Sequence, residues 1–298
     1  VDYFSRKTDG LLYNLPISSS NGVTNLLSNQ GALKNIGVEV ELTSKNIVAR
    51  KAGGFSWTTE ANFTWFKNRI LRLESAIEDQ ELALNSFTLA NYAGVDPATG
   101  EALWFTNNTK STLTTNWASA GRYNQGTALP KYYGGITNTF SYKRFSLRTL
   151  IYYNFGNKVY DSWGAHAHTD GSLGFSDIGA MPRYIYDRRW QKPGDITDVP
   201  KVVFLGTQSG LSNQASTRFL YDGGYIRLRD VALSYSFTNR FTSKLRLSKM
   251  SAFIKANNLF TWVEDDRLRA DPEVSTAGYL DYKPPVFRTL TIGLSIQF

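Results

Sequence analysis

The sequence contains no cysteine among its 298 residues. This absence excludes disulfide bridges, zinc sites built from thiolates and a cysteine nucleophile. It is compatible with any compartment, so it does not locate the protein. Ser, His and Asp are present, but neither a nucleophile elbow nor a glycine-rich phosphate loop accompanies them. The sequence therefore predicts neither an enzyme nor a bound cofactor.

Charged residues are scarce and long apolar runs are missing. Asp, Glu, Lys and Arg make up 19% of the chain, against about 25% in soluble globular proteins. A transmembrane helix needs about 18 consecutive apolar residues, whereas the charge-free stretches 11–32 and 202–217 are rich in Ser, Asn, Gly and Thr. Aromatic residues reach 14%. This combination is typical of a membrane β-barrel.

The chain is basic, with a formal net charge of +8 and a pI of about 9.4. Lys and Arg are scattered singly or in pairs such as Arg50-Lys51, Lys143-Arg144 and Arg188-Arg189. A nucleic-acid-binding face would normally concentrate them on one element, so no nucleic-acid partner is predicted. Basic rims that meet anionic outer-membrane lipid or lipopolysaccharide fit this distribution better.

The segment 290–298 alternates as a membrane-spanning strand does. Successive side chains of a β-strand point to opposite faces. One face of this segment carries only large apolar side chains: Leu290, Ile292, Leu294, Ile296 and Phe298. The other carries Thr291, Gly293, Ser295 and Gln297. An apolar lipid-facing row backed by a polar lumen-facing row is expected of a barrel wall.

Other segments alternate in the same way. A hairpin is predicted about Lys143-Arg144, and an earlier one joins 38–43 to 55–65. In 229–237 the outward row runs through Leu233 and Val231, and its continuation places Arg227 and Arg229 at the head-group edge of the apolar band. Aromatic residues near strand ends predict girdles at both interfaces. They are Trp57, Trp65, Tyr133, Tyr142, Tyr153 and Tyr235.

The lengths of the segments and of their connections separate a barrel from a soluble sheet. Several segments reach about ten residues, enough to cross a bilayer at a tilt. Short connections are expected at 46–54, 143–144 and 238–248, and long ones at 15–32, 107–131, 156–223 and 260–285. Barrels have short periplasmic turns and long extracellular loops. We predict an all-β chain of about ten antiparallel transmembrane strands, roughly half of a larger barrel.

Three tryptophans, Trp163, Trp190 and Trp262, fall in the expected long loops. Aromatic rings stack on sugars, and they also pack within loops or against partner proteins. Packing within the loops is the favoured interpretation. Contact with a partner protein and contact with a substrate are the alternatives.

Two groups of residues could hold a metal by residue type alone. His166 and His168, near Asp161 and Asp170, lie in a glycine-rich loop that fixes no ligand spacing. An acidic run could gather oxygen ligands for Ca²⁺, but without the spacing of an EF-hand. Its candidate residues are Asp265, Asp266, Asp271 and Glu273. Solvated or structural loop residues are the favoured reading of both groups, so no metal is predicted.

A series of motifs resembles the SusC/RagA-type TonB-dependent transporters of Bacteroidetes outer membranes. The opening VDYFSRKT is followed by NIGVEV at 35–40, AGVDPATGE at 93–101, LPKYYGG at 129–135 and RWQKPGD at 189–195. GYIRLRDV at 224–231, NNLFT at 257–261 and ADPE at 270–273 complete the series. Each motif is weak alone, but their order along nearly the whole chain makes the resemblance specific.

The resemblance implies that residues 1–298 form the C-terminal part of a barrel of about 22 strands, without the plug domain and TonB box. It implies import of oligosaccharides or peptides across the outer membrane, driven by TonB through the plug and assisted by a SusD-like surface lipoprotein. It makes 271–273 a motif that fixes a loop. It also makes 290–298 the closing strand, with Phe298 as a barrel-assembly signal.

Two other functions fit the alternation without the resemblance. A passive porin would have the same strands but no plug. A secreted β-sandwich adhesin would show the same period of two, since its exposed faces are polar.

Overall fold

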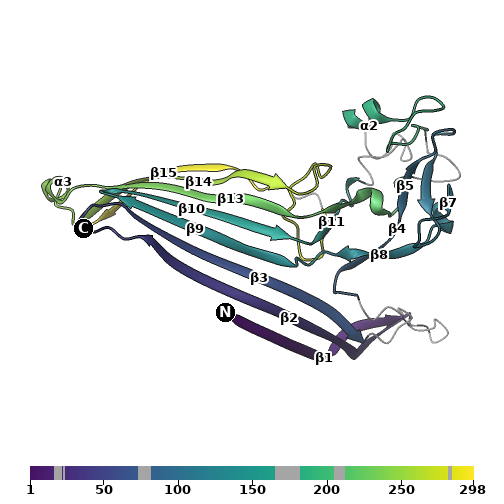
Figure 1. Ribbon diagram of the computed structural model, residues 1–298, viewed down its shortest axis with the longest axis horizontal. Coiled ribbons are helices and arrows are strands. Elements are labelled where there is room, and N and C mark those ends of the chain that lie inside the picture. Colours follow the sequence, from purple (N-terminus) through teal and green to yellow (C-terminus); the bar gives the residue numbers. More distant parts are fainter. Residues whose placement is uncertain (17–21, 23, 73–81, 165–181, 205–211, 281–283) are drawn as a thin grey trace.

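The computed structural model describes residues 1–16, 22, 24–72, 82–164, 182–204, 212–280 and 284–298. Eight of its strands form one antiparallel sheet, here called the wall, in which neighbours follow one another along the chain (Figure 1). In order they are β1 (Asp2–Pro16), β2 (Asn25–Ile47), β3 (Ser56–Arg72), β9 (Tyr132–Tyr142), β10 (Phe145–Phe155), β13 (Tyr225–Ser236), β14 (Lys249–Val263) and β15 (Thr289–Gln297). Within the described residues β1 and β15 are the two edges, each with one strand neighbour.

The wall has one apolar face and one polar face. A row of directly paired, wholly apolar residues crosses seven strands: Ile47, Trp57, Phe140, Leu147, Leu233, Ile254 and Ile292. The row beside it is polar except for one alanine: Lys45, Thr58, Thr139, Arg148, Ala232, Lys255 and Thr291. We call the apolar face the outer face and the polar one the lumen face. The alternation predicted for the wall strands is confirmed.

The outer face is left uncovered by the described part of the chain. Leu290 and Ile292 are 69% and 74% exposed, and large apolar side chains on the neighbouring strands are exposed as well. A soluble β-sandwich buries such a face against a second sheet. The sandwich alternative is therefore wrong, whereas a lipid-facing wall accounts for the exposure.

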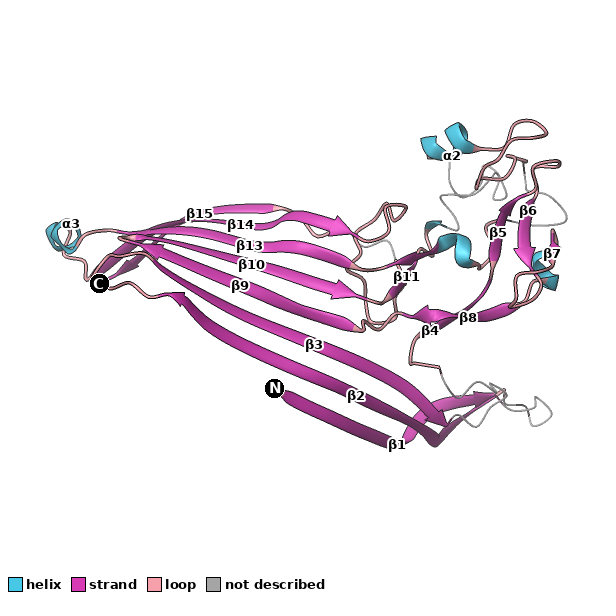
Figure 2. Cartoon of the chain, viewed as in Figure 1, coloured by secondary structure: helices cyan, strands magenta, loops and turns pink. Residues whose placement is uncertain are grey.

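Short and long connections lie at opposite ends of the wall (Figure 2). The short ones, at 48–55, 143–144 and 237–248, agree with the prediction, and the last contains α3 (Asn239–Lys244). The long ones join β3 to β9, β10 to β13 and β14 to β15. Phe298 follows β15 at the short-turn end (Figure 1). No helix in the described ranges is long and apolar enough to cross a membrane.

Two details of the predicted connections are wrong. The expected loop 15–32 is largely strand, because β1 runs to Pro16 and pairs there with Asn25, the first residue of β2. Its Ser, Asn and Gly content suggested a loop, yet ladder hydrogen bonds use backbone groups and do not need apolar side chains. Within the described residues the wall has eight strands, where about ten were predicted. Further short strands belong to separate small sheets in the long connections.

A β-bulge reverses the faces of β13 near its loop end. Asp230 pairs with Leu150 and Leu228 with Ile151, so Arg229 has no direct partner on β10. On β14 the same irregularity includes Asn258, whose φ of 55° is tolerated better by Asn than by most residues. Because one residue is skipped, Arg227 falls on the lumen face with 1% exposure. The predicted head-group position of Arg227 and Arg229 is therefore wrong.

Aromatic rings gather on the outer face near both ends of the wall. Close ring pairs are Phe145 with Tyr235 at 4.8 Å, Trp57 with Phe140 at 5.6 Å and Phe63 with Tyr132 at 6.3 Å. These positions agree with girdles at the two interfaces. Tyr133 is an exception among the predicted girdle residues, because strict pairing puts Tyr132 on the outer face and Tyr133 on the lumen face.

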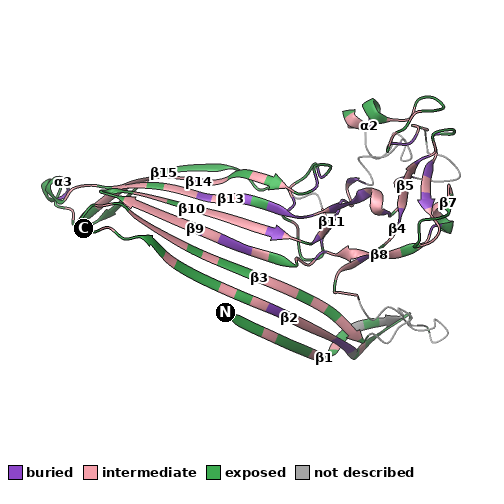
Figure 3. Cartoon of the chain, viewed as in Figure 1, coloured by how far each residue is buried: buried purple, intermediate pink, exposed green. Residues whose placement is uncertain are grey.

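The long connections form a folded unit at one end of the wall, here called the loop assembly. Its small sheets are β4 (Ser86–Ala90) with β8 (Arg122–Thr127), β5 (Tyr92–Val95) with β6 (Ala102–Phe105) and β7 (Leu113–Thr114), and β11 (Lys158–Tyr160) with β12 (Leu220–Asp222). Its helical turns are η2 (Trp117–Ser119), α2 (Arg183–Arg188) and η3 (Thr217–Phe219). Buried residues concentrate here and along its junction with the wall (Figure 3).

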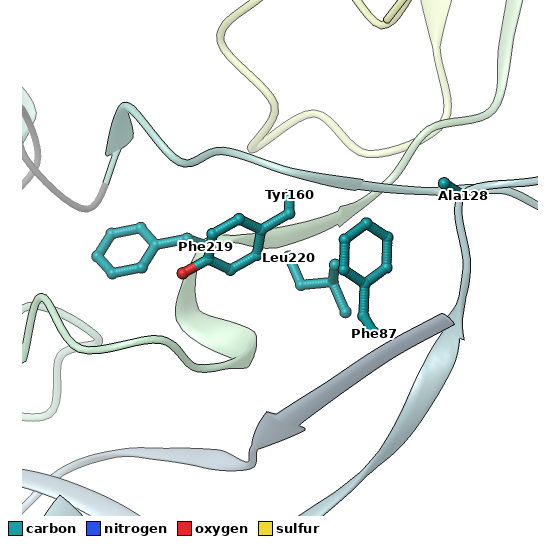
Figure 4. Close-up of a cluster of buried hydrophobic side chains, with 5 residues drawn as sticks. All are labelled: Phe87, Ala128, Tyr160, Phe219 and Leu220. Carbon is teal, nitrogen blue, oxygen red and sulfur yellow. The ribbon is translucent and has the colours of Figure 1, made fainter. Parts of the chain in front are cut away.

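The loop assembly has hydrophobic cores of its own. One joins residues of the β3–β9 and β10–β13 connections: Phe87, Ala128, Tyr160, Phe219 and Leu220 (Figure 4). A second surrounds Trp104, which is fully buried with Ala90, Ala102 and Ala120. Burial of this apolar surface fixes the connections as a globular unit.

Cross-strand aromatic rings cover glycines in the wall. Phe4 lies over Gly37 and Phe253 over Gly293, each pair being direct partners in the ladder. Tyr153 covers its partner Gly134 and donates a hydrogen bond to the carbonyl oxygen of Asn62 at 3.1 Å. The rings supply the side-chain contact that a glycine lacks, which stabilises a strand at a weak position.

Replacement of Gly134 by Val should destabilise the wall by about 1–3 kcal/mol, the usual cost of overpacking. A Cβ there would lie 2.2 Å from the Asn62 carbonyl oxygen, whereas at Gly135 its nearest neighbour is a Leu150 methyl at 3.4 Å. The measurement is the temperature at which the intact receptor changes from its folded to its unfolded migration on gels. Gly135→Ala is the control. Equal temperatures for the two variants would contradict the packing role of Gly134.

Candidate functional site

The lumen face carries a cluster of charges midway along the wall. The Asp230 carboxylate is nearly buried, and it lies 2.9 Å from the Lys255 ammonium and 3.6 Å from the Arg148 guanidinium. The side-chain amide of Asn257 donates a hydrogen bond to the same carboxylate at 3.1 Å. β10, β13 and β14 each supply members because the ladder places them side by side. The face thus presents fixed positive and negative groups to the lumen, as a polar barrel interior does.

Arg227 ties the β14–β15 connection to the wall. Its two terminal nitrogens lie 2.6 Å from an Asp271 oxygen and 2.8 Å from a Glu273 oxygen. Its Nε donates to the Thr261 hydroxyl at 3.1 Å, so β14 also holds the guanidinium. Arg229 binds the second oxygen of Glu273 at 2.6 Å. We call this network, Arg227, Arg229, Asp271 and Glu273, the arginine clip.

The clip also orders the backbone of the connection. Asp271 accepts hydrogen bonds from the backbone N–H of Glu273 at 2.9 Å and of Val286 at 3.2 Å. Charge-assisted bonds of this kind are stronger than neutral ones. Because Arg227 is almost fully buried, loss of its partners would leave an uncompensated charge. The motif at 271–273 therefore fixes a loop, as the resemblance implied.

A cleft of about 780 Å³ lies between the arginine clip and the loop assembly. Its walls come from the end of β14, the β14–β15 connection and the start of the β10–β13 connection. Trp163 lines it with Asp161, Arg269 and Tyr279. An aromatic ring with charged and hydroxyl groups is a lining suited to polar, ring-bearing or amide-bearing ligands.

The three candidate tryptophans have three different environments. Trp163 lines the cleft. Trp190 packs on Gly100, and its indole N–H donates to the carbonyl oxygen of Pro97 at 3.0 Å, which is packing within the loops. Trp262 is not in a loop: it lies in β14 opposite Ile226 on the outer face, 6.3 Å from the ring of Phe155. Of the three, Trp163 is the one placed for contact with a ligand.

The acidic candidates are divided between separate arginines. Asp265 binds Arg267 at 2.6 Å, while Asp271 and Glu273 belong to the arginine clip. Asp266 is exposed. No group of three or more metal-ligating side chains occurs within the described residues. His166, His168 and Asp170 lie outside them.

A smaller pocket of about 340 Å³ inside the loop assembly combines tyrosines with basic side chains. Arg269 lies 4.2 Å from the centre of the Tyr184 ring, and Arg267 lies 5.7 Å from that of Tyr221. Burial raises the pKa of Tyr184 to about 12 and also raises that of Tyr221. These phenols are therefore protonated at physiological pH.

Hydrogen bonding also shifts two loop carboxylates. Burial of Asp265 raises its pKa, but hydrogen bonds from Arg267 outweigh that effect, so the pKa is lowered overall. The backbone N–H of Ala98 and the Thr99 hydroxyl lower the pKa of Asp96, which closes the turn at 96–101. Both carboxylates are charged near neutral pH and act as structural acceptors in the loop assembly.

The comparisons with known proteins agree with the fold. No family model matches the chain. TonB-dependent receptor P3 of Formosa agariphila is 25% identical over 341 residues, and TonB-dependent receptor SusC of Bacteroides thetaiotaomicron is 23% identical over 325. Both alignments cover 100% of this chain. A solved structure of the RagAB peptide transporter superimposes on 99% of it with a TM-score of 0.80 and 21% identity.

The chain is similar over its whole length to SusC/RagA-type TonB-dependent receptors. It spans about a third of the length of the curated relatives it matches, 32% for receptor P3 and 30% for SusC. As an outer-membrane β-barrel segment it has an outer face toward lipid and a lumen face toward the interior. By the general rule for such barrels, its short turns face the periplasm and its loop assembly the exterior.

Sequence reasoning missed the arginine clip, although part of its signal was visible. Two arginines interrupt an otherwise apolar outward row at 227 and 229, and two carboxylates recur at 271 and 273. Matching the two pairs by charge would have suggested the contact. Their common face could not be deduced, since it depends on the bulge at Arg229.

Replacement of Arg227 by Gln should free the β14–β15 connection. Loss of a buried ion-pair partner costs about 3–5 kcal/mol, so local opening should increase roughly a hundredfold or more. The measurement is the rate of proteinase K cleavage between β14 and β15 in the intact receptor. Arg183→Gln is the control, because both partners of its ion pair with Asp187 are exposed, at 91% and 51%, and such a pair is worth little. Equal cleavage rates in the two variants would rule out the clip as the anchor.

Proposed function

We propose that this segment forms the C-terminal barrel wall and part of the extracellular mouth of a TonB-dependent importer of oligosaccharides or peptides. The observation that carries the proposal is the position of the cleft. It lies where the lumen face meets the loop assembly, with Trp163 on one side and the arginine clip beneath. A substrate held there stands at the entrance to the barrel.

The lumen face supports the transport part of the proposal. Ion pairs about Asp230 and rows of Thr and Ser offer hydrogen-bond partners along the wall. Hydroxyl-rich glycans and peptide backbones need such partners when they leave water. The RagAB complex is a peptide transporter by its title, and the relative SusC is a TonB-dependent receptor, so both substrate classes remain within the proposal.

The partners follow from the same relatives. We assign to the intact receptor a plug domain that receives energy from TonB and a SusD-like surface lipoprotein over the mouth. The far end of the loop assembly offers apolar contact area for such a lipoprotein, since Ile196 is 94% and Tyr186 64% exposed beside α2. Exposed apolar side chains at a rim are characteristic of protein–protein contact.

A passive porin is the competing function. The packed loop assembly favours the importer, because a folded unit with its own hydrophobic cores is more than a diffusion pore requires. The distinguishing experiment measures uptake of labelled oligosaccharides and peptides by cells that carry the intact receptor. Uptake through an importer should stop when the proton-motive force is dissipated or TonB is deleted. Unchanged uptake under both treatments would establish a porin.

Trp163→Ala should weaken substrate binding roughly tenfold, the order of one lost aromatic contact. The matched control is Trp262→Ala, which removes the same side chain from the outer face, where no substrate passes. Affinity of the purified receptor for the transported compound is the measurement. The role of Trp163 is refuted if the two variants bind equally well.

A further inference from the structure

The charges of the chain are unevenly distributed between the two ends of the wall. The three short connections, 48–55, 143–144 and 237–248, hold seven Lys or Arg residues and no Asp or Glu. The connections at the other end, 17–24, 73–131, 156–224 and 264–288, hold 14 Lys or Arg against 19 Asp or Glu. The short-turn end is thus strongly positive, whereas the loop end is slightly negative.

The three basic turns form one continuous surface. The backbone N–H of Lys143 donates to the carbonyl oxygen of Gly53 at 3.0 Å, which joins the first turn to the second. The carbonyl oxygen of Arg144 accepts from the backbone N–H of Ser236 at 2.9 Å, which joins the second to the start of the third. Neighbouring turns are therefore hydrogen-bonded to one another, which brings their positive charges together at one end of the wall. We call this surface the basic turn platform.

Aromatic and apolar side chains border the platform on the outer face. The rings of Phe145 and Tyr235 lie 4.8 Å apart, and Phe237 contacts Tyr235 at 5.2 Å. The ammonium of Lys143 lies 5.2 Å from the centre of the Tyr142 ring, so this charge is held at the lipid-facing side. Amphipathic rings with adjacent cations are the usual composition of a membrane–water interface.

The helix α3 repeats the same combination within the third turn. Phe241 and Leu245 are 45% and 52% exposed, and Phe241 stacks on Phe237 at 5.3 Å. Arg240 and Lys244, one position earlier in each case, are exposed as well. Basic residues beside an exposed apolar pair characterise segments that lie in the head-group region. The Thr238 hydroxyl accepts a hydrogen bond from the Phe241 backbone N–H at 3.2 Å, which fixes the start of the helix.

We propose that the basic turn platform binds the anionic head groups of glycerophospholipids in the periplasmic leaflet of the outer membrane. Charge complementarity commits the surface to this occupant: its connections carry no acidic side chain that would repel a phosphate. The exposed apolar border is continuous with the lipid-facing side of the wall, so acyl chains can follow it. Each Lys or Arg near an anionic leaflet increases the affinity of the protein for its lipids.

The test compares two variants of the intact receptor that lose the same charge. Arg240→Gln/Lys244→Gln/Arg246→Gln alters the platform, whereas Lys110→Gln/Arg183→Gln/Lys192→Gln alters the loop assembly. The three platform side chains are exposed and make no hydrogen bond or ion pair with any described residue, so the fold should persist. Heat-modifiable migration on gels verifies folding of both.

Native mass spectrometry then measures binding of phosphatidylglycerol and of phosphatidylcholine with the same acyl chains. The wild type and the loop variant should bind phosphatidylglycerol roughly tenfold more tightly, and the platform variant should lose that preference. The proposal is overturned if the wild type shows no preference, if the platform variant keeps it, or if the loop variant loses it equally. Binding of a periplasmic protein or a peptidoglycan fragment in place of phosphatidylglycerol would overturn it too.

Discussion

The wall depends on one constraint, the satisfaction of backbone hydrogen bonds where no water is present. Within a bilayer each unpaired N–H or C=O costs several kcal/mol, so the strands must pair continuously. The chain meets this requirement with eight strands that each pair with the next, without a crossover. The constraint also explains why polar residues can occupy half of every strand: pairing uses the backbone and leaves the side chains to suit each face.

The bulge at Arg229 shows how this regular ladder accommodates a specific site. One skipped residue turns Arg227 from the lipid side to the lumen side, where it meets Asp271 and Glu273. The cost of burying a guanidinium is offset because three neighbouring groups bind it. These few strong contacts join the wall to the loop assembly. They also fix the position of Asp271 and Glu273, which line the cleft.

The sequence predicted the parts of the structure that follow from a period of two. The outer face of 290–298 and the turn at Lys143-Arg144 are examples, because both can be predicted from residues that are neighbours in the sequence. The bulge is not, since it depends on how β13 meets two neighbours at once. The small sheets of the loop assembly were also missed, as their cores combine residues distant in sequence, such as Phe87 and Phe219.

The two ends of the wall differ in charge and in the way they are stabilised. Aromatic rings and basic turns fix the depth of the wall at one interface, where the connections are too short to fold independently. At the other end long connections build a unit that buries hydrophobic cores of its own. Each end thus uses a different source of stability, and the arginine clip lies at the boundary between them. At this boundary Arg227 of the wall binds Asp271 and Glu273 of the β14–β15 connection.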